Sequence, residues 1–135
     1  MSGRKKRLAL FGTWLLALFV LGGLAICQYQ YRHSRAVMQQ ARNSFEKDLA
    51  SSLLAGSDVN RVLEFLKFHR MTYTDLGEPV YRDARWYQDA DKTMEAKGPE
   101  LKTSVLNCAI HLELKFDKNS KLLGYRDSMP CTGPW

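Results

Sequence analysis

Residues 8–28 read LALFGTWLLALFVLGGLAICQ and contain no charged side chain. An α-helix rises about 1.5 Å per residue, so this run spans roughly 30 Å, the thickness of the hydrocarbon core of a bilayer. We therefore expect a transmembrane helix over residues 8–28, with the lipid bilayer as its partner. The location of the rest of the chain depends on this anchor.

The charges that flank this run predict its orientation. Only Arg32 and Arg35 follow it closely, whereas four successive basic residues precede it, Arg4, Lys5, Lys6 and Arg7. Because lysine and arginine are retained in the cytoplasm, residues 1–7 are predicted to be a cytoplasmic tail. The remainder is then the periplasmic part of a bacterial inner-membrane protein. A type II anchored protein of a eukaryotic secretory membrane is the alternative.

Two kinds of processing would change the anchor. Gly23 and Ala25 fit a small-x-small cleavage site before Ile26, but the apolar run is longer than the core of a usual signal peptide. Residues 24–27 resemble a lipobox that ends in Cys27, but Ile26 occupies a position that requires a small residue. We therefore expect an uncleaved signal-anchor in which Cys27 is a free thiol.

Small residues recur within the run at every fourth position, at Ala9, Thr13 and Ala17. This spacing lets two helix backbones approach closely, so these residues are a candidate helix-pairing face. The partner would be a second copy of the chain, forming a homodimer, or another membrane protein. A face turned to lipid is the alternative.

The part of the chain beyond the run is nearly neutral. It contains all fourteen Asp and Glu residues and sixteen of the twenty Lys and Arg residues, so the net charge of +6 comes mainly from the N-terminal tail. This balance does not favour nucleic acid as a partner. Without internal repeats, residues 56–135 are expected to form one small α+β domain.

Helical periodicity continues beyond the membrane. An apolar stripe at i+4 spacing predicts a juxtamembrane helix over residues 29–55, at Val37, Ala41, Phe45, Leu49 and Leu53. The stripe packs either on the domain's own sheet or on a partner helix. Gly56 should end this helix, and Ser57 should cap a second one. The second helix has a predicted apolar face and a basic C-terminal end, at Val59, Val62, Leu63, Leu66, Lys67, His69 and Arg70.

Strand signals fill most of the remainder. Met71–Asp75 and Pro79–Gln88 are β-prone, whereas Asp89–Pro99 is charged and aperiodic and is predicted to be a mobile loop. One half-buried strand is predicted from alternating apolar residues, Leu106, Cys108, Ile110, Leu112, Leu114 and Phe116. Asp117–Lys121 is a predicted turn, and Leu122–Asp127 returns as the hairpin partner. We expect an antiparallel sheet of three to four strands.

The register of this hairpin bears on the cysteines. Opposed residues in an antiparallel pair have a constant sum of residue numbers, and core residues must face each other. Pairing Phe116 with Leu123 and Leu114 with Tyr125 meets both conditions and leaves residues 118–121 as the loop. The same register places Cys108 opposite Cys131, within disulfide range, although Pro130 should distort the ladder locally. In an oxidising compartment we predict a Cys108–Cys131 disulfide, with two free thiols as the alternative.

Cysteine and histidine also raise a redox or metal-handling alternative. Cys108 and His111 are three residues apart, and a copper or zinc site would need Cys131, His69 or His33 as well. Residues three apart on a strand point to opposite faces, so Cys108 and His111 would share a metal only at a bulge. We therefore predict no metal site and no cofactor.

No sequence motif assembles catalytic groups. Ser57 and His69 lie on one predicted helix without the sharp turn of a nucleophile, and Asp89 with Asp91 fits a solvated loop better than an acid pair. We predict a non-enzymatic interaction or accessory domain whose partner is another membrane or envelope protein. The biological process is not indicated by the sequence.

Residues 56–126 resemble a family of small envelope domains. Gly56-Ser57 and the apolar face of the second helix precede Leu114-Lys115-Phe116-Asp117 and Lys121-Leu122. This order is similar to the G-x-x-x-x-V-x-x-x-L and F-D-x-x-G-x-V pattern of SmpA/OmlA-type lipoproteins of outer-membrane barrel assembly. The resemblance implies a helix, then an antiparallel sheet, and an interaction role. The family's role in barrel assembly is not expected of this chain, because an anchor replaces the lipidated cysteine of the family and Ser120 replaces its turn glycine. The closing Thr132-Gly133-Pro134 is similar to the ends of uncharacterised membrane-anchored bacterial proteins.

Overall fold

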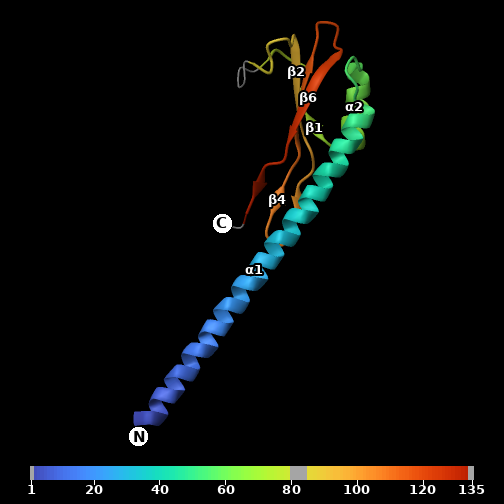
Figure 1. Ribbon diagram of the computed structural model, residues 1–135. Helices are drawn as coiled ribbons and strands as arrows, with labels where there is room; N and C mark the ends of the chain where they lie inside the picture. Colours follow the sequence, from blue (N-terminus) through green and yellow to red (C-terminus); the bar gives the residue numbers. More distant parts are fainter. Residues whose placement is uncertain (1, 80–84, 134–135) are drawn as a thin grey trace.

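The computed structural model describes residues 2–79 and 85–133 and has the expected α+β fold (Figure 1). A long helix and a short helix are followed by seven strands: α1 (Ser2–Ser52), α2 (Val59–Phe68), β1 (Thr72–Tyr73), β2 (Lys92–Lys97), β3 (Leu101–Lys102), β4 (Asn107–Cys108), β5 (His111–Phe116), β6 (Leu122–Ser128) and β7 (Cys131–Thr132). The helices lie along one side of the strands. The N-terminal half of α1 extends away from them.

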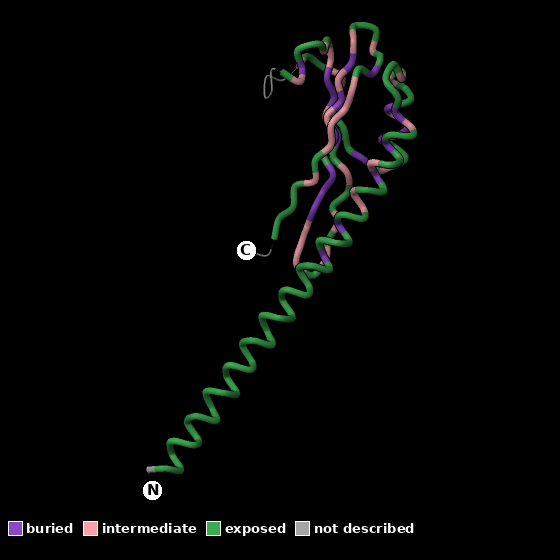
Figure 2. The backbone as a smooth tube through the Cα atoms, viewed as in Figure 1, coloured by how far each residue is buried: buried purple, intermediate pink, exposed green. Residues whose placement is uncertain are grey.

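α1 is one unbroken helix of 51 residues whose two halves have different surroundings. Residues 3–33 are exposed along their whole length, and the first buried side chain is Ser34, which is 1% exposed (Figure 2). Within the described residues, α1 is the one helix that is long and apolar enough to cross a membrane. The same helix therefore supplies both the predicted span and a part of the domain.

The apolar stripe of α1 packs on the domain's own core, where Phe45, Leu49 and Leu53 are buried. Farther toward the N-terminus the prediction was wrong, because Val37 is exposed and Met38 is buried instead. An α-helix has 3.6 residues per turn, so a strict i+4 series rotates by about 40° at each step and leaves the buried face. Residues at mixed three- and four-residue spacing stay on the buried face of the helix.

α2 begins one residue later than predicted. The Ser57 hydroxyl donates to the Leu54 carbonyl at 2.6 Å, and α2 is capped by the next residue instead. Asp58 is the N-cap, and its Oδ1 accepts from the Val59 N–H at 2.8 Å. α1 ends at Ser52 rather than at the predicted residue 55, and Gly56 lies in the turn that follows, with a φ of 86° that favours glycine. The buried face of α2 consists of Val62, Phe65 and Leu66.

The strands form a four-stranded antiparallel sheet in the order β1-β2-β5-β6 and a three-stranded sheet in the order β3-β4-β7. Three segments of the chain contribute one strand to each sheet: β2 with β3, β4 with β5, and β6 with β7. Each segment is interrupted between its two strands, and the three interruptions lie at the same level. The Gly98 N–H donates to the Ile110 carbonyl at 2.8 Å, and the Ala109 N–H donates to the Pro130 carbonyl at 3.2 Å. Proline lacks an N–H, so Pro99 and Pro130 cannot donate to a regular ladder at this level. The long strand predicted to begin at Leu106 is therefore divided into β4 and β5.

The prediction of a mobile loop over Asp89–Pro99 was wrong, because β2 lies inside the four-stranded sheet. Met94 and Ala96 are buried in the core, and β2 pairs along its whole length with β5. Interspersed charged residues concealed this short apolar alternation in the sequence. Glu95 is only partly exposed on the other face of the strand.

The two β-prone pieces have different outcomes. Met71–Asp75 contains β1, which pairs with the end of β2. Within Pro79–Gln88, residues 80–84 lie outside the described part of the chain. Trp86 and Tyr87 lie in a turn rather than in the predicted strand.

The hairpin register was predicted correctly except beside its turn. Leu114 pairs with Tyr125 and Cys108 pairs with Cys131, but Phe116 pairs with Leu122 because a bulge follows the Lys115–Gly124 pair. The Leu122 N–H also donates to the Ser57 carbonyl at 2.8 Å, and the Gly56 N–H donates to the Leu122 carbonyl. These bonds hold Leu122 in the core, where Leu123 had been expected.

The core lies between the helices and the four-stranded sheet. Its members come from α1, α2 and the inward face of the strands, and they include Phe45, Leu49, Leu53, Val62, Phe65, Leu66, Met94, Leu112, Leu114, Phe116 and Leu122.

A partly buried ion network joins α1 to the sheet at the edge of this core. Arg42 Nε donates to Glu46 Oε1 at 2.8 Å and to Asp127 Oδ2 of β6 at 3.2 Å. Although burial opposes the charged form, the two carboxylates raise the pKa of Arg42.

Two leucines near the end of α1 test whether this helix is part of the core. Leu49 is 1% exposed and Leu54 is 65% exposed. We expect Leu49→Ala to lower the free energy of unfolding by about 2–5 kcal/mol, because it leaves a cavity. Leu54→Ala should change it by less than about 0.5 kcal/mol. Urea unfolding of the full chain in detergent micelles measures both, and equal effects would contradict the packing of α1 on the domain.

Candidate interaction site

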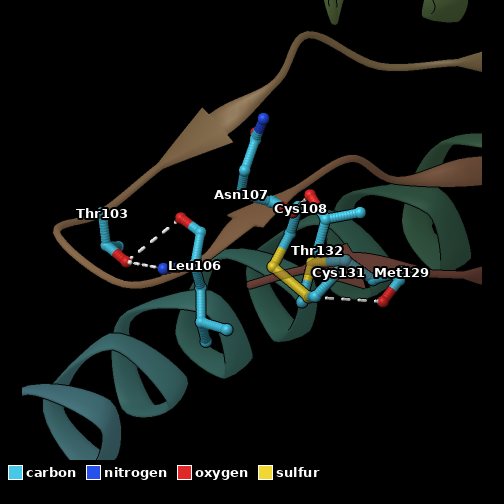
Figure 3. The surroundings of a disulfide bond; sticks show 7 residues. All are labelled: Thr103, Leu106, Asn107, Cys108, Met129, Cys131 and Thr132. Atoms are coloured by element: carbon cyan, nitrogen blue, oxygen red, sulfur yellow. Dashed lines mark hydrogen bonds between the residues drawn. A yellow bond between two sulfur atoms is a disulfide. The ribbon is translucent and has the colours of Figure 1, made fainter. Parts of the chain in front are cut away.

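The sheet that lies nearest the apolar half of α1 is crosslinked by a disulfide (Figure 3). Cys108 of β4 and Cys131 of β7 are bonded, with their Cα atoms 4.1 Å apart, so the predicted pairing is confirmed. Cys108 is buried and Cys131 is exposed. Cys27 is free and exposed on α1. The bond therefore holds β7 against β4 beyond the interruption at Pro130.

A cleft of about 310 Å³ lies between α1 and the level at which the strands are interrupted. Its walls are largely apolar and come from four parts of the fold: Ala41, Ser44, Phe45 and Asp48 of α1, His69 and Met71 after α2, Gly98, Pro99 and Leu101 between β2 and β3, and Ile110 before β5. Gly98 and Pro99, which lie between β2 and β3, thus form part of the cleft wall.

His69 forms the polar end of this cleft. It is the C-cap residue of α2, and its Nε2 lies 3.9 Å from Asp48 Oδ2 on α1. Its ring contacts Phe65, Phe45 and Phe68, with centroid distances of 4.4, 5.2 and 5.2 Å. Phe68 itself is 81% exposed. At this end, the apolar cleft is therefore flanked by the Asp48 carboxylate and the exposed Phe68 ring.

A second cluster covers the face of the sheet opposite the core. The Arg126 guanidinium lies 4.6 Å from the ring centroid of Trp86, and the Lys115 ammonium lies 5.0 Å from it. Tyr87 donates its hydroxyl to Glu113 at 3.2 Å, and Glu113 also pairs with Arg126. These contacts attach the turn that contains Trp86 to β5 and β6. The cluster is a structural attachment.

The charges of this cluster perturb two neighbouring pKa values. Burial, followed by the nearby Glu113 carboxylate, raises the pKa of Tyr87. A hydrogen bond from Lys115, at 2.8 Å, lowers the pKa of Asp89. Asp89 thus forms an ion pair with Lys115 of β5. Asp91 contributes its backbone N–H, which donates to the Phe116 carbonyl at 3.0 Å.

The other residues considered for chemistry are not brought together. His33 stacks on Tyr29 in α1, His111 is exposed at the start of β5, and His69 lies beside α2. Across residues 2–79 and 85–133, no group of three or more His, Cys, Asp and Glu side chains is placed to hold a metal ion. Ser57 and His69 lie at opposite ends of α2.

The candidate pairing face of α1 lies in its exposed half. Ala9, Thr13 and Ala17 line a shallow apolar hollow together with Gly12, Leu16, Val20 and Leu21. The Thr13 hydroxyl donates to the Leu10 carbonyl at 2.8 Å, so its one O–H donor is used within the helix. Helix pairing through this face stays a prediction.

Sequence reasoning missed the cleft, although it noticed some of its residues. Gly98-Pro99 was assigned to a loop, and Ala41 was recognised only as a member of the stripe. The useful signal would have been the Gly98-Pro99 and Pro130-Cys131 pairs, which interrupt the two segments on either side of β4 and β5 at one level. That signal is readable only after the strands have been paired.

No protein-family model matches the chain, and comparisons with curated proteins and with solved structures give no match. The resemblance to SmpA/OmlA-type lipoproteins therefore stays a prediction. Function has to be inferred from the geometry of the anchor and the domain.

The disulfide should contribute strongly to the stability of so small a domain. We expect Cys131→Ser to lower the free energy of unfolding by about 3 kcal/mol, because a bond across this sequence separation restricts the unfolded chain. Cys27→Ser is the matched control and should leave the stability unchanged, because Cys27 is exposed on α1. Urea unfolding of the full chain in detergent micelles provides the comparison.

The same bond reports on the compartment. Thiols alkylated in intact cells and mapped by mass spectrometry of non-reduced peptides should show Cys108 linked to Cys131 and Cys27 alkylated. Finding Cys108 and Cys131 both alkylated would contradict an oxidising location for the domain.

Proposed function

We propose that this protein is a single-pass bacterial inner-membrane protein whose periplasmic domain binds another envelope protein. The long apolar α1 and the basic residues before it support the anchor and its orientation. The Cys108–Cys131 disulfide supports an oxidising location for the domain. In this proposal the domain is an accessory module without catalytic chemistry of its own.

The observation that carries the binding role is the cleft between α1 and the sheets. Its volume lies at the lower end of the range for binding pockets, and its walls are mainly apolar with few polar groups. Such a hollow suits one or two apolar side chains of a partner protein. The exposed Phe68 beside His69 extends the apolar surface at one end.

The position of the cleft limits the partner. Ala41 and Asp48 lie thirteen and twenty residues beyond Gln28, which corresponds to about 20 and 30 Å along a continuous helix. The cleft is thus held at a fixed height above the bilayer rather than on a flexible tether. A partner that binds there is itself membrane-bound or lies close to the membrane surface.

Site-specific photocrosslinking tests this role. Ser44 lines the cleft, whereas its neighbour Asn43 is exposed but is not among the lining residues. A photoreactive phenylalanine analogue at position 44, introduced into the full chain in living cells, should give a discrete adduct with an envelope protein. The same analogue at position 43 should give much less of that adduct.

A variant of the cleft provides the second arm. Gly98→Leu places a bulky side chain near Ile110 at the cleft wall, where a Cβ would lie 3.5 Å from the Ile110 carbonyl oxygen. It should abolish the position-44 adduct while the Cys108–Cys131 bond still forms. Equal adducts at positions 43 and 44, or an adduct unaffected by Gly98→Leu, would contradict binding in the cleft.

A further inference from the structure

The domain begins very close to the end of the apolar run on α1. Ser34 is the first buried residue of the helix, and it lies six residues beyond Gln28, or about 9 Å along the axis. Each interfacial layer of a bilayer is about 5–8 Å thick. If α1 spans a bilayer as proposed above, the base of the domain lies at the outer limit of the headgroups.

The turn between β3 and β4 is the part of the described domain that reaches toward this level. Figure 1 shows the three-stranded sheet running along α1 toward its apolar half, and Figure 3 shows the turn beyond Thr103 and Leu106 continuing in that direction. The turn is internally fixed. The Thr103 N–H donates to the Leu106 carbonyl at 2.8 Å, and the Leu106 N–H donates to Thr103 Oγ1 at 3.0 Å.

The chemistry of this end of the molecule fits a lipid surface. Tyr29 and Tyr31 follow the apolar run directly and are exposed, as is usual for aromatic residues at a membrane interface. Arg32 and Arg35 come next on α1, and Lys102 is exposed on β3. The chain has no Asp or Glu before Glu46.

One of these basic residues, Lys102, has an acidic neighbour, Glu100. Glu100 Oε2 is 3.7 Å from Lys102 Nζ, and both side chains are more than half exposed. A solvent-exposed pair of this kind is weak, so it leaves Lys102 able to contact a phosphate. The turn itself carries Ser104, Val105 and Leu106, whose small or partly exposed apolar side chains suit contact with headgroups.

We infer that the β3–β4 turn, Lys102–Leu106, rests on the phospholipid headgroups of the bilayer that α1 spans. Lys102, together with Arg32 and Arg35 on α1, faces the lipid phosphates. Transmembrane helices are commonly tilted by about 20°, and a tilt toward the sheet lowers the turn onto the surface. The domain then contacts the membrane at two places, through its helix and through this turn. The inference rests on the proposed anchoring.

Depth measurement by fluorescence quenching tests it on the full chain in nanodiscs. In a Cys27→Ser background, a single environment-sensitive label is attached at Ser104→Cys, at Asn119→Cys or at Phe19→Cys. Asn119 lies in the exposed turn between β5 and β6, at the other end of the domain, and Phe19 is exposed in the apolar half of α1. Headgroup-attached quenchers are used for the first two sites and acyl-chain quenchers for the third.

The three labels separate the outcomes. We expect quenching at positions 104 and 19 but not at position 119. Equal and weak quenching at positions 104 and 119, with position 19 quenched, would overturn the contact of the turn and leave the anchoring intact. Absence of quenching at position 19 would overturn the anchoring and this inference with it. Retention of the Cys108–Cys131 bond is checked by mass spectrometry in every variant.

Varying the charge of the lipid headgroups provides a second test of the inference. Lys102→Gln should lower the ratio of docked to undocked turn about fivefold in nanodiscs that contain anionic phospholipid, since a basic residue near such a surface contributes attraction of that order. In purely zwitterionic nanodiscs the variant and the parent should give the same quenching at position 104. An identical response to Lys102→Gln in both lipids would contradict recognition of phosphate charge by Lys102.

Discussion

The continuity of α1 is the constraint on which the rest of the structure depends. One helix carries the apolar run and then, without a break, the residues that pack on the sheets. α1 is exposed around its whole circumference up to His33 and has one buried face from Ser34 onward, while its helical geometry continues unchanged. The core is therefore built on the same helix that carries the apolar run.

The strands beside this helix are divided into two sheets. The four-stranded sheet shares a core with Leu49 and α2, and the three-stranded sheet runs along α1 toward its apolar half. At the level between them, Gly98, Pro99 and Pro130 interrupt the ladder, and the Cys108–Cys131 bond secures the shorter strands beyond it. Two short strands such as β4 and β7 would be weakly held by two ladder positions alone. Gly98 and Pro99 also line the cleft, so the candidate binding surface lies at the level at which the strands are interrupted.

Much of this arrangement was readable from the sequence because it depends on local patterns. The apolar run, the second helix and the β5–β6 hairpin have strong periodicity, and the constant register of the hairpin alone predicts Cys108 opposite Cys131, as the structure has it. The failures have tertiary causes. β2 has only two residues in the core, Met94 and Ala96, so its sequence pattern resembles that of a loop. Ser57 has the residue type of a cap, but its position is determined by bonds to Leu54 and Leu122 that no local pattern indicates. The cleft could not be predicted, since it is formed by four segments that are distant in the chain.

A distance measured along α1 tests the continuity most directly. Spin labels at Tyr29→Cys and Lys47→Cys, in a Cys27→Ser background and in nanodiscs, lie eighteen residues apart, which is five full turns of one helix. An unbroken helix predicts a single narrow distance distribution centred near 27 Å. A broad distribution, or a mean well below that value, would show that the helix bends or unfolds between the span and the domain. That result would contradict the account.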